Sequence, residues 1–181
     1  MIAQTPSILH LSRFFFAANA AELQSAYEGL ASDGAPLPIV TDWREVAFSF
    51  NRLFVGPRAL QAPPYASLYL DGDDTRLMGA STSRIRQLYA MLGLASPWQD
   101  RIPDDHLALE LDALWQIEQA LATVASPQLH DARDYLIGRL RAWVPAFVGR
   151  IQAAPQVHPV IVAVADALTR ALSRVDPITV C

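Results

Sequence analysis

The chain has 181 residues, a length that suits one domain, and its 52% apolar and 18% charged residues exclude wholesale disorder. All 14 basic side chains are arginine; they form no dense cluster and are outnumbered by 18 acidic ones, which argues against nucleic acid as a partner. A chain without lysine and with one cysteine, Cys181, cannot carry P-loop lysine chemistry, paired-cysteine metal sites or an internal disulfide, and we expect a cytoplasmic protein.

No targeting segment or membrane span is expected. The longest stretch without Asp, Glu or Arg, residues 151–165, is shorter than the roughly 20 apolar residues that a spanning helix needs.

The N-terminal third has helical periodicity. Apolar residues at positions 9, 16, 23, 27 and 30 predict one long helix, or two helices broken around Asn19. Asp42 followed by Glu45 has the spacing of a capping box, and the helix it opens should continue to residue 53 and end at Gly56-Pro57.

Two irregular connections follow, residues 56–80 and 95–106, with one helix between them. Ser81 or Thr82 can cap that helix, which should end near Gly93. Long connections in a helical domain often carry function, but both can equally be ordinary surface loops.

Three more helices complete the pattern. Apolar residues recur every three or four positions over residues 107–124, 136–151 and 160–175. Pro103-Asp104-Asp105 places a rigid residue and two acids before the first of them, which suits the positive end of a helix dipole. We therefore predict an all-α fold, with residues 1–181 forming a single domain of about six or seven helices.

Recognisable catalytic and metal-binding patterns are missing. The four histidines, at positions 10, 106, 130 and 158, include no i, i+4 pair, and the sequence has neither a G-x-S-x-G elbow nor a glycine-rich phosphate loop. From these patterns we assign no catalytic residue, no metal site and no cofactor.

Asp105 and His106 stand at a predicted helix start and allow two interpretations. In the first, Asp105 caps the helix and His106 packs on its flank. In the second, the pair forms the acidic, hydrogen-bonding edge of an apolar groove, suited to a ligand that is cationic at one end and apolar at the other. Tyr65 and Tyr69 either close the core or line that groove.

Several ordered motifs carry a resemblance to a known family. They are LFVGP at 53–57, PPY at 63–65 with SLYLDG at 67–72, LMGAST at 77–82, and PDDHLALEL at 103–111. WVPAF at 143–147 is similar to the C-terminal helix of the same family. From about residue 43 onward the chain resembles the TorD/DmsD/NarJ family of redox-enzyme maturation chaperones.

The resemblance implies an all-helical cytoplasmic chaperone that is not an enzyme. Such a protein binds the twin-arginine leader, or the apoprotein, of a molybdopterin oxidoreductase of the dimethyl sulfoxide reductase type and holds it until its cofactor is inserted, before export. By motif position, the peptide-binding residues would be Leu68, Tyr69, Gly79, Trp98, Asp105 and His106. Acids at positions 71, 73, 74, 104 and 105 would pair with the leader arginines, beside an apolar groove lined by Leu68, Tyr69, Met78 and Tyr89.

Two other functions stay open at this point. One is a nitrate-reductase-type assembly factor for a molybdoenzyme subunit that is not exported. The other is a small hydrolase that uses Asp105 and His106 as an acid–base pair. The sequence is compatible with a monomer or with a dimer that exchanges helices through the 56–80 connection, and it does not identify the client.

Overall fold

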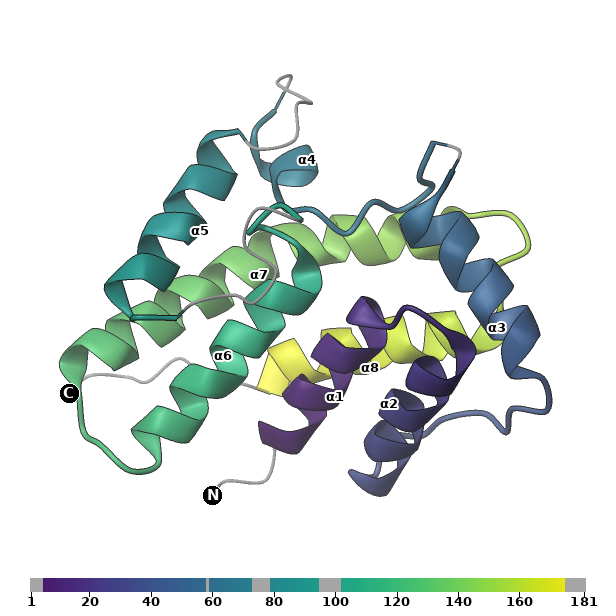
Figure 1. The fold of residues 1–181 in the computed structure, drawn as a ribbon, viewed down its shortest axis with the longest axis horizontal. Coiled ribbons are helices and arrows are strands. Elements are labelled where there is room, and N and C mark those ends of the chain that lie inside the picture. The colour runs from purple at the N-terminus through teal and green to yellow at the C-terminus, as the bar shows by residue number, and fades with distance from the viewer. Residues whose placement is uncertain (1–4, 58, 73–78, 95–101, 175–181) are drawn as a thin grey trace.

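The computed structural model describes residues 5–57, 59–72, 79–94 and 102–174, and within these ranges the secondary structure is helical (Figure 1). The helices are α1 (Thr5–Phe16), α2 (Ala20–Ser32), α3 (Trp43–Phe50), the π-helical turn η1 (Asn51–Val55), α4 (Ser67–Leu70), α5 (Ala80–Met91), α6 (Leu107–Leu121), α7 (Pro127–Ala153) and α8 (Pro159–Arg174). The predicted all-α class is confirmed; the single-turn helix α4 lies in a segment that we expected to be irregular.

Local capping confirms the predicted helix starts near the N-terminus. Asn19 separates α1 from α2: its side chain accepts from the Glu22 amide at 3.0 Å, and the Glu22 carboxylate accepts from the Ala18 amide at 2.8 Å. Asp42 caps α3 by accepting from the Arg44 amide at 2.7 Å. The helix then continues through η1 to Gly56, whose φ of 97° ends it in a conformation that glycine adopts without strain.

Two predicted caps are wrong. The residue that precedes α5 is Gly79, which offers no side chain, and Ser81 and Thr82 lie inside the helix with their hydroxyls donating to Asp71 and Asp105. The cap of α6 is His106 rather than Asp105, because Nδ1 of His106 accepts from the Ala108 amide at 3.1 Å.

The core forms where α1 packs between α2, α6 and α8 (Figure 1). The hydroxyl of Ser12 donates to the Ala108 carbonyl at 2.8 Å, which fixes α1 against the first turn of α6. Burial of each large apolar side chain contributes about 1.5–3 kcal/mol. Edge-to-face ring contacts connect α1, α3 and η1 through Phe14, Phe15, Phe50 and Phe54, and Phe15 also contacts Phe147 of α7.

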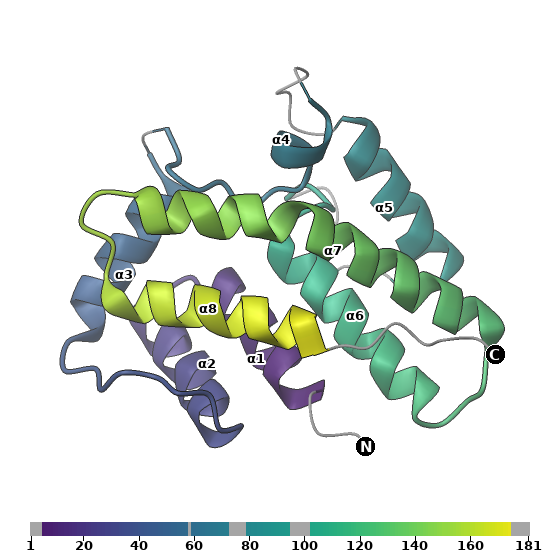
Figure 2. The same cartoon turned by 180° about the vertical axis from the view of Figure 1, so that it is seen from behind.

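The long helix α7 runs beside α8 on the other side of the molecule, and α5 lies at one edge, above α6 and α7 (Figure 2). Of the helices described, none is both long enough and apolar enough to cross a bilayer. The two connections that flank α5 meet where residues 64–67 run alongside residues 105–107. The Leu107 amide donates to Pro64 and the Ala66 amide donates to Asp105, with backbone N···O distances of 2.8 and 3.0 Å.

Candidate functional site

Asp105 is the centre of the region where the two connections meet. Its side chain is completely buried, and both of its oxygens accept hydrogen bonds from this chain: Oδ2 from the Ser67 amide at 2.7 Å and Oδ1 from the Thr82 hydroxyl at 2.9 Å. One carboxylate therefore ties the start of α4, the first turn of α5 and the start of α6 together.

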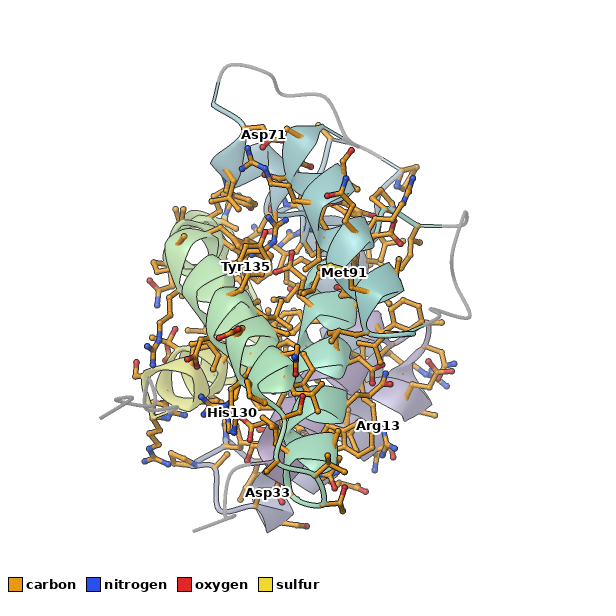
Figure 3. The ribbon with its side chains drawn as sticks, turned by 90° about the vertical axis from the view of Figure 1, so that its left-hand side faces the viewer. Arg13, Asp33, Asp71, Met91, His130 and Tyr135 are labelled. Atoms are coloured by element: carbon orange, nitrogen blue, oxygen red, sulfur yellow. The ribbon has the colours of Figure 1, made fainter. Side chains whose placement is uncertain are left out.

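The neighbouring acids are also engaged. Asp104 is buried and forms an ion pair with Arg86 of α5, and its backbone carbonyl accepts from the Tyr89 hydroxyl at 3.3 Å. Asp71 accepts from the amide and the hydroxyl of Ser81. Figure 3 shows Asp71 at the top of the molecule, where α4 approaches α5. The expected pairing of these carboxylates with client arginines would thus compete with bonds inside the fold; residues 73 and 74 lie outside the described ranges.

His106 is held between two aromatic rings. Its imidazole contacts Phe16 of α1 at a centroid distance of 6.0 Å and Tyr65 at 5.2 Å, both edge to face. Burial lowers the pKa of His106 to about 4, although the nearby Asp105 opposes this shift. His106 is therefore neutral at physiological pH, and because Nδ1 accepts the cap hydrogen bond, the ring proton is on Nε2.

Tyr69 lies on the opposite side of this junction, against α7. Its ring stacks on Trp143 with a centroid distance of 5.4 Å, and its hydroxyl donates to the Pro63 carbonyl at 2.9 Å. The guanidinium carbon of Arg150 lies 4.8 Å from the ring centroid. Burial raises the pKa of Tyr69 to about 12 and Arg150 opposes the shift, so the phenol stays neutral.

A buried charged network lies directly behind Asp105. Glu110, one turn into α6, accepts from Nε of Arg139 at 2.8 Å and from the Trp143 indole at 3.2 Å. Burial raises the pKa of Glu110 to about 7, while Arg139 and the two hydrogen bonds act in the opposite direction. Because Trp143 also stacks on Tyr69, this network links α4, α6 and α7.

A cavity of about 620 Å³ opens beside α1, α2, α6 and the end of α5. Small side chains line part of it: Ser12, Ala26, Ala108 and Ala113. Large apolar ones line the rest, among them Leu9, Phe16, Tyr89, Leu94, Leu109 and Trp115. Its volume lies in the range of ligand-binding pockets, and this lining suits apolar side chains of a ligand.

Charged groups stand beside the same cavity. Glu22 and Asp112 contribute two carboxylates, and Arg13 contributes one guanidinium. Asp112 accepts from the Gln116 amide at 2.6 Å within α6. Figure 3 shows Arg13 on the opposite flank of α6 from Tyr135 of α7, so the cavity lies away from the α7 face. The excess of carboxylates favours a ligand that carries positive charge next to its apolar part.

The predicted binding residues that the structure describes do not line this cavity. Asp105, His106 and Gly79 lie around the junction, and Leu68 and Tyr69 lie on α4; of these five, none is in the cavity lining. His106 comes nearest, through its contact with Phe16. Trp98 and Met78 lie outside the described residues, and Tyr89, expected in the apolar groove, does line the cavity.

Sequence analysis missed the contribution of the two N-terminal helices to the cavity. Leu9 and Phe16 were recognised as a helical stripe, but Arg13, Glu22 and the small residues of α2 were not singled out. The periodicity of a stripe shows that a face is apolar and does not show whether neighbouring helices cover it completely. Within the described residues, no group of three or more His, Cys, Asp or Glu side chains is arranged to hold a metal ion.

Comparison with known proteins identifies the family. A family model described as nitrate reductase delta subunit matches residues 16–149, well over half of the chain. The chain belongs to the nitrate reductase delta subunit family. The match begins at the end of α1 and spans the junction, most of the cavity and most of α7.

Curated proteins that are similar in sequence to this chain are named as chaperones. A Tat proofreading chaperone, DmsD of Salmonella typhi, is 35% identical over 101 residues, which cover 55% of this chain and 46% of that protein. A chaperone protein TorD from a Psychrobacter species is 34% identical over 152 residues, 78% of this chain and 65% of that one. The matched regions thus span about half to two thirds of those relatives. The resemblance to redox-enzyme maturation chaperones is confirmed.

The fold of this nitrate reductase delta subunit family member is shared with a solved structure. A crystal structure from Archaeoglobus fulgidus, described as that of a redox enzyme maturation protein, superposes with a TM-score of 0.66. It covers 93% of this chain and 94% of the other at 19% sequence identity, so the likeness concerns the fold alone.

Proposed function

We propose that this chain is a cytoplasmic maturation chaperone that binds the twin-arginine leader, or the apoprotein, of a molybdopterin oxidoreductase before export, and that it is not an enzyme. The observation that carries the proposal is the cavity of about 620 Å³ in a chain whose curated relatives are named as chaperones. Its apolar lining suits the apolar segment that follows two arginines in such a leader.

The client segment extends from the cavity across the junction in this proposal. The ring of Phe16 lines the cavity and contacts His106, and His106 contacts Tyr65, which precedes α4. A peptide that followed these rings would reach Leu68 and Tyr69. Asp105 then acts as a positioning residue, because it holds α4, α5 and α6 in place through buried hydrogen bonds.

The energy available in the cavity fits reversible binding. Burial of an apolar side chain is worth about 1.5–3 kcal/mol, and ordering each side chain costs about 0.5–1.5 kcal/mol. A client that buries several such side chains and adds backbone and charge contacts can reach the roughly −8 kcal/mol of a micromolar complex. No covalent step is required for capture or release.

Calorimetric titration with a synthetic twin-arginine leader peptide tests the proposal. Ser25 is exposed on α2 and lines the cavity, so Ser25→Trp should occupy it and weaken leader binding at least tenfold. Gln24, the preceding exposed residue, is outside the cavity lining, and Gln24→Trp should bind like the wild type. Equal affinities of the two variants, or no saturable binding to wild type, would contradict the proposal.

A second candidate is favoured by the family model, which is described as nitrate reductase delta subunit. In that case the client is a molybdoenzyme subunit that is not exported, and the bound segment carries no export leader. Co-purification of the client separates the two, because the client of the first candidate carries a functional export leader and the client of the second does not. The hydrolase alternative is not favoured, since a histidine with a pKa of about 4 is a weak base at neutral pH.

A further inference from the structure

The face of the Tyr69 ring is a cation-binding surface that this chain already covers with one of its own arginines. Tyr69 is half-buried, and one face of its ring is stacked on Trp143. The Arg150 guanidinium lies over the ring at 4.8 Å from its centroid, within the distance at which a cation is attracted to an aromatic face. The hydroxyl donates to the Pro63 carbonyl, and its oxygen also accepts from Arg150.

Arg150 is held there by the ring and not by an acid. It is exposed on α7, and among the described residues no carboxylate lies within ion-pair distance of it. Tyr69 keeps its proton across the physiological range, so Arg150 is held by the electron-rich face of a neutral ring together with a hydrogen bond to the Tyr69 side chain. Such an exposed contact is weak, and another guanidinium can displace it.

Of the acids that were expected to recognise client arginines, the three within the described residues are occupied. Asp71 is bound to Ser81, Asp104 to Arg86, and Asp105 to the Ser67 amide and the Thr82 hydroxyl. Each of these contacts attaches α4 or α5 to its neighbours, whereas Arg150 is exposed and its contact among the described residues is with the Tyr69 side chain. Among the described groups of the predicted site, the Tyr69 ring is therefore the cation-binding group that a client can reach without breaking a carboxylate contact inside the fold.

We propose that Arg150 is a placeholder on the Tyr69 ring, and that a guanidinium of the client leader displaces it on binding. The proposal rests on the proposed function, since it assigns the seat of one leader arginine. It makes Arg150 a residue that opposes binding in the free protein, so its removal should tighten the complex. A direct contact between Arg150 and the client would have the opposite effect.

The first arm of the test compares two leader peptides, one with both arginines and one with glutamines in their place. Arg150→Gln should bind the arginine peptide about two- to fivefold more tightly than wild type, a factor that corresponds to about 0.5–1 kcal/mol. Its affinity for the glutamine peptide should be the same as that of wild type. Arg44→Gln removes the same charge from an exposed position on α3 and controls for general electrostatics. The gain should vanish in Arg150→Gln/Tyr69→Leu and persist in Arg150→Gln/Tyr69→Phe, which keeps the ring.

The second arm needs no client. L-Argininamide is titrated into the full chain, and the Trp143 indole N–H resonance is followed by NMR, because that indole lies against Tyr69. Arg150→Gln should give a saturable shift at lower argininamide concentration than wild type, and adding Tyr69→Leu should abolish it. An Arg150→Gln variant that binds the arginine peptide more weakly, or argininamide no better than wild type, overturns the placeholder. Failure of wild type to bind any leader, with the argininamide result intact, overturns the proposed function and leaves the displaceable contact between Arg150 and the Tyr69 ring standing.

Discussion

Replacing Asp105 with alanine should act on the stability of the fold first, and on leader binding only through that loss of stability. The substitution leaves two buried donors, the Ser67 amide and the Thr82 hydroxyl, without their acceptor. Each unsatisfied buried donor costs about 1–3 kcal/mol, so the free energy of unfolding should fall by roughly 2–6 kcal/mol. For a chain of this size, that is a decrease in Tm of roughly 4–24 °C.

Thermal and urea denaturation followed by circular dichroism measure this loss. Asp105→Asn should fall between alanine and wild type, because the amide keeps one acceptor and turns an NH2 group towards one of the two donors. Glu28→Gln is a matched control at an exposed position of α2 and should change stability by less than about 0.5 kcal/mol. An Asp105→Ala protein that melts within 2 °C of wild type and has lost leader binding would refute the reasoning and show that the carboxylate faces the client.

Three further expectations concern titration and packing. The pKa of Glu110 is raised to about 7 in the folded state, so the native protein binds more protons than the unfolded chain. The free energy of unfolding should therefore fall as pH rises towards 7, by up to roughly 1.4 kcal/mol per pH unit. Denaturation at several pH values should show that Glu110→Gln lacks this decline. The pKa of His106 is lowered to about 4, so its contribution to stability rises between pH 4 and 6.5, and its ring resonances should not titrate above pH 5.5. Gly29→Ala should lower Tm because a Cβ would lie 2.5 Å from the His10 ring, whereas Gly138→Ala, with open space around it in α7, should raise stability by up to about 1 kcal/mol; a stabilised Gly29→Ala would contradict the packing seen here.

Local sequence rules predicted most of the helices. The Asn19 break and the Asp42 start follow from side chains that satisfy amides two or three residues away, so the residues themselves contain the information. Ser81 and Thr82 have the same capping chemistry, yet their hydroxyls bond to acids 10 and 23 residues distant. Distant partners of this kind arise from tertiary packing, which no local pattern encodes.

The candidate site was predictable in part, for a similar reason. The motifs pointed to Tyr69, Asp105 and His106, and the structure brings the two connections that carry them together. Their sequence does not reveal that the Asp105 carboxylate faces inward, because an acid before a helix is equally suited to capping, pairing and ligand binding. The cavity depends on how closely α1, α2 and α6 approach one another, and side-chain periodicity does not determine that distance.

The inward orientation of Asp105 separates the residues that hold the fold together from the residues that bind a client. Both of its oxygens serve the architecture, so a change of client places no demand on this residue. Substitutions that change which client is bound should instead lie in the cavity lining and around the Tyr69 ring, where they alter client binding without removing the hydrogen bonds that hold the fold together. In the proposed function, a new client can therefore be accommodated by a few substitutions in the cavity lining that leave the hydrogen bonds of Asp105 intact.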